Sequence, residues 1–291
     1  MRKLLYAACV AAMCACQSYD FGEGATDKEQ TKQFNFHVRG EFTTAFEEMT
    51  RAAVRLEESN TAGVTDLWVL DYATVQGESS PVLSQTVHQT ASDEGFGSVP
   101  MTLTYGHHDI KFIASKGTGA SLTASALSWT KAHDTFVLSY PVDVTATSNG
   151  NRAPELKRAI SGLKVVISDA IPQDAKYVVL TLGKRSQTLA LPSLEAQTFG
   201  ESSVELDCTA NRGVKGASAA IYTLAGDDEW TSTASIVVKR EDGSVITTIA
   251  LPDVTLKKNR MTTLTGNVFN RASGFSVAVD ASWEEPLDVE F

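Results

Sequence analysis

The chain has 291 residues, of which 43% are hydrophobic, and its 25 basic and 35 acidic residues give a net charge of −10. This length is large for one β-sandwich and suits two compact domains of about 100–150 residues each. The acidic balance argues against nucleic acid or an anionic lipid surface as a partner.

The first element in chain order is an export signal at residues 1–15. Arg2 and Lys3 precede the apolar run from Leu4 to Ala15, which is too short to span a membrane. The run ends in "MCAC", and bacterial lipoprotein signals place a small residue directly before the cysteine that receives the lipid. Cys16 fits this position best and is the predicted lipidation site. The alternative is an ordinary signal peptide with incidental cysteines.

Residues 16–32 are predicted to form a tether, after which "QFNFHVRGEF" alternates between large apolar and polar residues. This period of two indicates a strand that covers a core with one face. The apolar residues on that face are Phe34, Phe36, Val38 and Phe42.

Five further strands are predicted before position 148. "TDLWVLDYA" holds a continuous apolar run and indicates a strand buried on both faces. "VPMTLTY", "HDIKFIAS" and "DTFVLSYPVDVT" alternate, and "PVLSQTVHQT" is a weaker sixth strand. Only "TAFEEMTRAAVRLEES" has apolar residues at helical spacing, and it predicts a short helix.

A domain boundary is predicted at "TSNGNRAPE", residues 147–155, where Ser, Asn, Gly and Pro gather as in linkers and turns. The expected domains are residues 33–148 and 149–291. The second half again consists of short alternating strands. In it, "REDGSVI" predicts a hairpin closed by a two-residue primed turn at Asp242 and Gly243. Such a pattern favours an all-β fold of two antiparallel β-sandwich domains in tandem.

No motif in the sequence predicts an active site, because the hydrolase elbow, the zinc-protease pair and the complete phosphate loop are all missing. We therefore expect a protein that is not an enzyme and needs no cofactor. His107, His108 and Asp109 in "GHHD" were the one candidate for a metal. Neighbouring residues on a strand point to opposite faces, so a solvated turn without metal is the prediction.

The isolated cysteine and the tryptophans are predicted to have structural roles. Cys208 is in phase with apolar residues of a strand and is expected to be a small buried hydrophobic residue. It is the only cysteine after Cys16, so no disulfide framework within the mature chain is expected. Trp68, Trp129, Trp230 and Trp283 are expected in cores or interfaces. If the fold gathered them on one exposed face, they could instead form a platform for sugars.

Several phrases in this order resemble the fimbrillin-type fimbrial subunits of Bacteroidota, including their shorter anchor-like members. They are "FHVRGEF", "EEMTRA", "VTDLWVLDY", "SVPMTLTYGHHDIKFIASKG", "DTFVLSYPVDVT" and "FSVAVDASWEEP". The resemblance implies two transthyretin-like sandwiches, export as an outer-membrane lipoprotein, and assembly into fimbriae by strand donation between subunits. In polymerising fimbrillins a trypsin-like protease cleaves after an early arginine. The matching position here is Arg51, followed by Ala52, with Arg55 as a second choice.

The expected function is that of a surface-anchored fimbrial subunit that acts in assembly and cell adhesion. Its expected partners are other fimbrial subunits, the outer membrane through the lipid on Cys16, and surface receptors of host or bacterial cells. The strand that carries Phe34 to Phe42 could be the one lost on cleavage or the one that caps the groove. A glycan-binding surface lipoprotein is the alternative function, and a hydrolase without a local motif is a distant third. Stalk, anchor and tip roles stay open, although the short chain favours anchor or tip.

Overall fold

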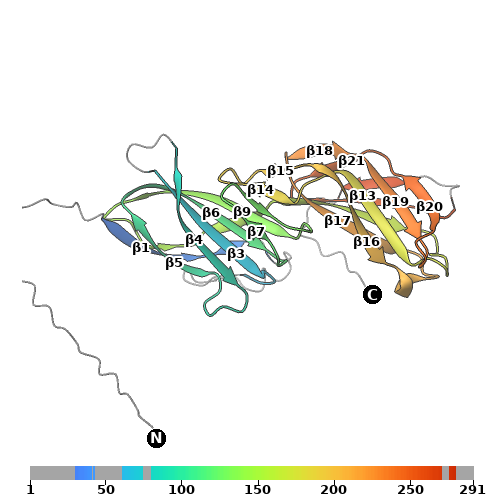
Figure 1. Cartoon of the computed structure of the whole chain (residues 1–291), viewed down its shortest axis with the longest axis horizontal. Coiled ribbons are helices and arrows are strands. Elements are labelled where there is room, and N and C mark those ends of the chain that lie inside the picture. The colour runs from blue at the N-terminus through green and yellow to red at the C-terminus, as the bar shows by residue number, and fades with distance from the viewer. Residues whose placement is uncertain (1–29, 41, 43–60, 75–79, 271–274, 280–291) are drawn as a thin grey trace, which may run out of the picture.

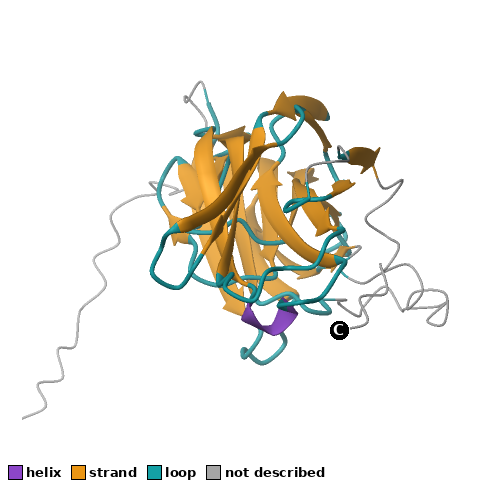
Figure 2. Ribbon diagram, turned by 90° about the vertical axis from the view of Figure 1, so that its right-hand side faces the viewer, coloured by secondary structure: helices purple, strands orange, loops and turns teal. Residues whose placement is uncertain are grey.

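The computed structural model describes residues 30–40, 42, 61–74, 80–270 and 275–279 (Figure 1). In this part of the chain nearly all regular structure is strand, and the single helical element is a 3-10 turn, η1 (Thr209–Asn211) (Figure 2). The all-β prediction is confirmed. The predicted helix at residues 44–59 lies outside the described residues.

The first half of the chain forms two facing sheets. One has the order β10-β1-β5 and the other has the order β2-β11-β9-β6-β3-β4. The strands are β1 (Thr31–His37), β2 (Arg39–Gly40), β3 (Asp66–Ala73), β4 (Val82–Thr90), β5 (Ser98–Thr104), β6 (Gly106–Ser115), β9 (Thr135–Val144), β10 (Asn151–Arg152) and β11 (Glu155–Arg158). Apolar side chains from both sheets, between Phe34 and Leu156, form one buried core.

The second half repeats the arrangement with sheets of order β17-β12-β22-β23 and β16-β13-β19-β20, and a two-stranded sheet β18-β21. The strands are β12 (Ile160–Ile167), β13 (Tyr177–Arg185), β16 (Gly200–Asp207), β17 (Ala217–Leu224), β18 (Glu229–Ser232), β19 (Ala234–Lys239), β20 (Val245–Ala250), β21 (Val254–Lys257), β22 (Met261–Gly266) and β23 (Ser276–Val279). Its core draws on residues between Leu163 and Val268.

A sixth sheet joins the halves, with the order β15-β14-β8-β7 (Figure 1). Strands β7 (Ser121–Leu122) and β8 (Ala126–Ser128) come from the first half, and β14 (Thr188–Ala190) and β15 (Ala196–Gln197) come from the second. Beneath it lies a third buried cluster, to which β3 contributes Trp68 and Leu70, and β17 contributes Leu224. Strand β3 therefore has a core on each side, and every one of its residues is buried, as its continuous apolar run predicted.

Three strand pairs run parallel, which differs from the purely antiparallel sandwiches expected. They are β1 with β10, β2 with β11, and β12 with β22, whereas the other strand pairs in the described part of the chain are antiparallel. Each parallel pair joins strands that are far apart in the chain, and parallel neighbours need such long connections. Sequence alternation gives the period of a strand but not the direction of its partner.

Backbone pairing with the first half continues beyond the expected boundary. Strand β10 pairs with β1, and β11 pairs with both β2 and β9, so the first half keeps its hydrogen-bonded neighbours up to Arg158. The division into domains at residues 148 and 149 stays a prediction. The expected tether, residues 16–32, overlaps the first strand at Thr31 and Lys32.

The predicted hairpin in "REDGSVI" is confirmed, but its turn is of another type. Arg240 N–H donates to the Ser244 carbonyl, and Gly243 N–H donates to the Arg240 carbonyl, so three residues lie in the loop. Of these, Gly243 has a φ of 82°. This combination is the three-residue hairpin that ends in a left-handed glycine, and the two-residue primed turn was wrong.

Candidate functional site

The candidate functional site is the strand β1 together with the neighbouring strands that hold it. β1 lies between two neighbours, antiparallel to β5 from Thr31 to His37 and parallel to β10 at Asn35 and Phe36. It is thus an interior strand of its sheet. It comes first among the described strands. Its apolar side chains pack against core residues that follow much later in the chain, between Val64 and Leu156.

The four apolar residues expected on one face all point into the core. Phe34, Phe36, Val38 and Phe42 are each 2% exposed or less. The Phe34 and Phe36 rings stack with centroids 5.7 Å apart, and Phe36 also meets Phe112 edge to face at 5.3 Å. Aromatic pairs of this geometry contribute beyond their burial. The predicted inward face is therefore confirmed.

A charged cluster holds the chain where it leaves β2. Lys116 Nζ donates to the Phe42 carbonyl over 2.6 Å, and the Phe42 ring meets Phe136 edge to face at 4.7 Å. The Arg158 guanidinium lies 4.8 Å from the centroid of the same Phe136 ring and donates twice to Asp134. Nothing in the local sequence predicts this cluster, because its members come from four separate segments.

Gly40 leaves room for the Phe42 ring because it has no side chain. A Cβ atom at this position would lie 2.7 Å from the Phe42 ring and 3.0 Å from the Leu156 carbonyl oxygen. A side chain at position 40 would therefore push Phe42 out of its place in the core.

The opposite face of β1 was expected to be polar and exposed. Asn35 is half-buried, accepts a hydrogen bond from the Ser98 hydroxyl, and lies 3.2 Å from the His37 ring through its side-chain amide. His37 is only 9% exposed, which the alternation did not predict. An outward position on a strand therefore does not ensure contact with solvent.

The predicted lipidation and cleavage sites cannot be placed. Cys16, Arg51 and Ala52 lie outside the described residues, as does the alternative Arg55. Among the described residues, no helix is long and apolar enough to cross a bilayer.

The three polar residues of "GHHD" lie on strand β6, so the predicted solvated turn was wrong. Each finds a different partner: His107 bonds to Asp143, His108 to Asp71, and Asp109 to Lys111. His107 is exposed and His108 is buried, which is the alternation expected of a strand. In the described part of the chain, no three acidic, histidine or cysteine side chains are grouped so that they could hold a metal ion.

The tryptophans and the cysteine are packed in cores. Trp68 and Trp129 are 4% and 5% exposed and meet edge to face at 6.2 Å in the cluster between the halves. Trp230 packs against the core of the second half, and Trp283 lies outside the described residues. Trp68 and Trp129 are therefore not available for stacking sugars. Cys208 is buried, as predicted, and burial raises the pKa of its thiol.

The comparisons with known proteins bear on the fold. No protein-family model matches the chain, and no curated protein matches it in sequence. Its structure is similar to that of a candidate adhesin from Bacteroides ovatus, with a TM-score of 0.51 and 8% identity over 81% of this chain and 88% of that one. The resemblance stated from the sequence is therefore confirmed at the level of the fold.

Two further solved structures come from Porphyromonas gingivalis. The tip fimbrial protein Mfa3 has a TM-score of 0.44 and 12% identity over 87% of this chain and 100% of its own. The fimbrial anchor protein Mfa2 has a TM-score of 0.42 and 10% identity over 86% and 98%, respectively.

Proposed function

We propose that this protein is a surface-anchored fimbrial subunit that acts in assembly and cell adhesion and is not an enzyme. One observation carries the proposal: β1, a strand from the start of the chain, is an interior strand whose apolar face completes the core of a sandwich. An interior strand supplied by one short segment is one that a second subunit can replace. The adhesin-like fold is in line with this role.

Strand exchange is the proposed means of assembly. If the segment from β1 to Phe42 left, the backbone N–H and C=O groups of β5, β10 and β11 that now bond to it would be open. The four places in the core that Phe34, Phe36, Val38 and Phe42 fill would then be empty. Such an edge is a template for an extended segment of another subunit, which supplies backbone hydrogen bonds and alternate side chains. Burying four side chains of this size stabilises the bound strand by about 6–10 kcal/mol before the cost of ordering it.

Attachment to the outer membrane is proposed through a lipid on Cys16, since "MCACQS" closes the short apolar run. In the Cys16→Ala variant we expect the protein to move from the membrane fraction to the soluble periplasm. Cell fractionation with antibody detection measures this. The matched control is Cys14→Ala, which should stay with the membranes. The opposite behaviour of the two variants would show that the lipid is on another cysteine.

Limited trypsin digestion followed by size-exclusion chromatography tests the assembly role. If the protein polymerises, cleavage after Arg51 should leave the β1 fragment associated at first, because ladder hydrogen bonds and core contacts hold it. A peptide that copies a donor strand should then displace β1 and give oligomers that resist mild denaturation. Mass spectrometry identifies the cut, and Arg51→Gln is the control that should resist it.

An anchor or tip subunit should behave differently. The protein would then resist cleavage at Arg51 or stay monomeric after it. Monomer after complete cleavage, with donor peptide present, would rule out the polymerising role. If the donor peptide displaces β1 neither before nor after cleavage at Arg51, the result would contradict strand exchange itself.

A further inference from the structure

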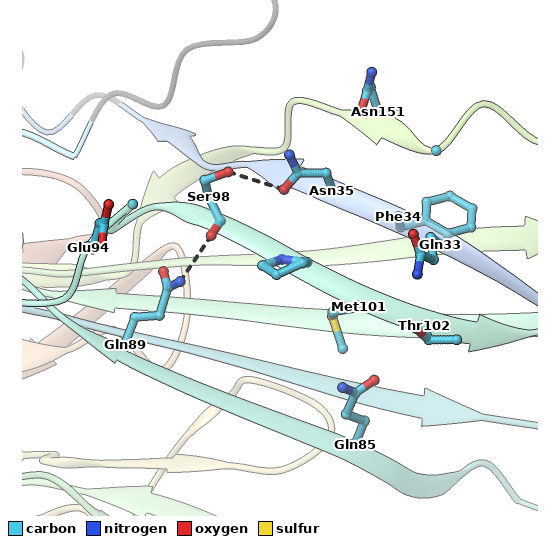
Figure 3. Close-up of a pocket in the computed structure, with 13 residues that line it drawn as sticks. Gln33, Phe34, Asn35, Gln85, Gln89, Glu94, Ser98, Met101, Thr102 and Asn151 are labelled. Atoms are coloured by element: carbon cyan, nitrogen blue, oxygen red, sulfur yellow. Dashed lines mark hydrogen bonds between the residues drawn. The ribbon is translucent and has the colours of Figure 1, made fainter.

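A cavity of 810 Å³ lies in the first half, where the edge strands β4 and β5 of the two sheets face each other (Figure 3). Among the described residues, β4 pairs only with β3 and β5 pairs only with β1, so these two strand edges have no further strand beside them. Side chains from β1, β4, β5 and the segment around β10 line the cavity. Its volume is within the range of small-molecule pockets, about 300–1,000 Å³.

The lining is rich in side-chain amides. Gln85 and Gln89 rise from β4 toward β5, Gln33 and Asn35 lie on the face of β1 opposite the buried Phe34, and Asn151 lies on β10 (Figure 3). An amide offers two donors and an acceptor, and a hydroxyl offers a donor and acceptors. Glu94 is the one charged residue among those that line the cavity. The cavity thus suits a neutral ligand with many hydroxyl groups and disfavours an anion.

Two of these amides already have structural roles. Gln89 accepts from Gly97 N–H and donates to the Ser98 carbonyl, while Ser98 donates through its hydroxyl to Asn35. Gln33 and Gln85 make no side-chain hydrogen bond within the described residues. Their amides can therefore bond to a ligand, and replacing them removes no side-chain hydrogen bond among the described residues.

The outer edge of β5 is largely closed to a further strand. Tyr105 N–H bonds to the Gln30 carbonyl, so by alternation the even-numbered residues of β5 direct their backbone groups away from β1. The carbonyl of Ser98 accepts from Gln89, that of Thr104 accepts from His108, and Pro100 has no N–H. Among the residues of β5, only Thr102 is left with both backbone groups directed into open space.

We propose that this cavity binds a neutral saccharide, held by Gln33, Gln85, Thr102 and Asn151. Sugar hydroxyls both donate and accept, which matches the amides, the Thr102 hydroxyl and its open backbone groups. A peptide strand needs a run of open N–H and C=O groups, and β5 offers them at one residue. This binding needs neither a fimbria nor strand exchange, so its failure would leave the proposed function unaffected.

Nuclear magnetic resonance of the ¹⁵N-labelled protein tests the site. The probes are maltotetraose, cellotetraose, mannotetraose and chitotetraose, each at up to about 10 mM. We expect at least one to shift the side-chain amide signals of Gln33 and Gln85. Gln33→Ala and Gln85→Ala should each weaken its affinity about three- to tenfold, as the loss of one hydrogen bond does. The matched control is Gln173→Ala, an exposed glutamine of the second half, which should leave the affinity unchanged.

Three outcomes would overturn the saccharide site. One is that none of the four tetrasaccharides shifts these signals. Another is that binding is the same in both variants as in the unmodified protein, which would place the sugar elsewhere. The third is that an extended eight-residue peptide shifts the β5 backbone signals while the sugars do not, which would make this edge a site for strand addition.

Discussion

At the scale of single residues, His108 is a buried histidine with a hydrogen-bond acceptor at each ring nitrogen. Its Nδ1 lies 2.8 Å from an Asp71 carboxylate oxygen, and its Nε2 lies 2.9 Å from the Thr104 carbonyl oxygen. Both partners are acceptors, and only the imidazolium has a proton on each nitrogen. Burial by itself lowers the pKa of His108, but the hydrogen bond and charge of Asp71 and the Thr104 carbonyl outweigh it, so the pKa is raised. The ring is 1% exposed, which makes this a buried ion pair.

The stability of the protein should therefore depend on pH through His108. The folded-state pKa lies above the unfolded value of about 6.5, so the stabilisation is fully present below that pH and is lost as the pH rises through the folded pKa. In the His108→Gln variant, the free energy of unfolding measured with urea should no longer show this loss as the pH rises. The substitution should also lower the free energy of unfolding by about 3–5 kcal/mol at pH 6, because Asp71 loses its buried partner. The control His107→Gln, at the exposed neighbour, should keep the dependence; a profile unchanged in His108→Gln would refute the ion pair.

At the scale of elements, β1 shows which structural features the alternation of apolar and polar residues can predict. The period of two correctly placed Phe34, Phe36 and Val38 in the core, because successive side chains of a strand point to opposite faces. It could not identify β5 and β10 as neighbours, nor the parallel direction of β10. It also failed for His37, which lies on the polar face of the pattern and is nevertheless buried.

The core of the first half should be sensitive to the loss of an aromatic ring of β1. Phe36 contacts Phe34, Phe112 and Tyr140, and it is fully buried. We expect Phe36→Ala to lower the free energy of unfolding by about 3–5 kcal/mol. The matched control is Phe199→Ala, where the ring is 41% exposed and the loss should stay below about 1 kcal/mol. Chemical denaturation followed by circular dichroism measures both, and equal losses would contradict the role given to β1.

At the scale of the whole molecule, the two halves are tied by a shared sheet. β8 pairs with β14 from Ala126 to Ser128, and the cluster beneath holds residues from both halves. Arg158 of the first half also donates to Asn259 of the second. The halves thus share backbone hydrogen bonds and buried apolar area, which couples their unfolding.

We expect the protein to unfold in a single calorimetric transition, and Leu127→Ala to separate it into two. Leu127 is fully buried in the shared cluster, so its truncation should cost about 2–5 kcal/mol and weaken the contact between the halves. Leu264→Ala is the matched control, since this leucine is equally buried within the core of the second half. It should lower the transition temperature and keep one transition. A single transition in Leu127→Ala would show that the shared cluster does not couple the halves.

The sequence by itself determined the all-β class, most strand positions, the buried faces of β1 and β3, and the buried state of Cys208. These depend on local periodicity, which each segment carries alone. Only the tertiary structure decided the parallel pairs, the sheet shared by β8 and β14, the His108–Asp71 pair and the cavity beside β5. Each of these joins residues from segments far apart in the chain, and no local pattern specifies which distant strand becomes a neighbour or in which direction it runs.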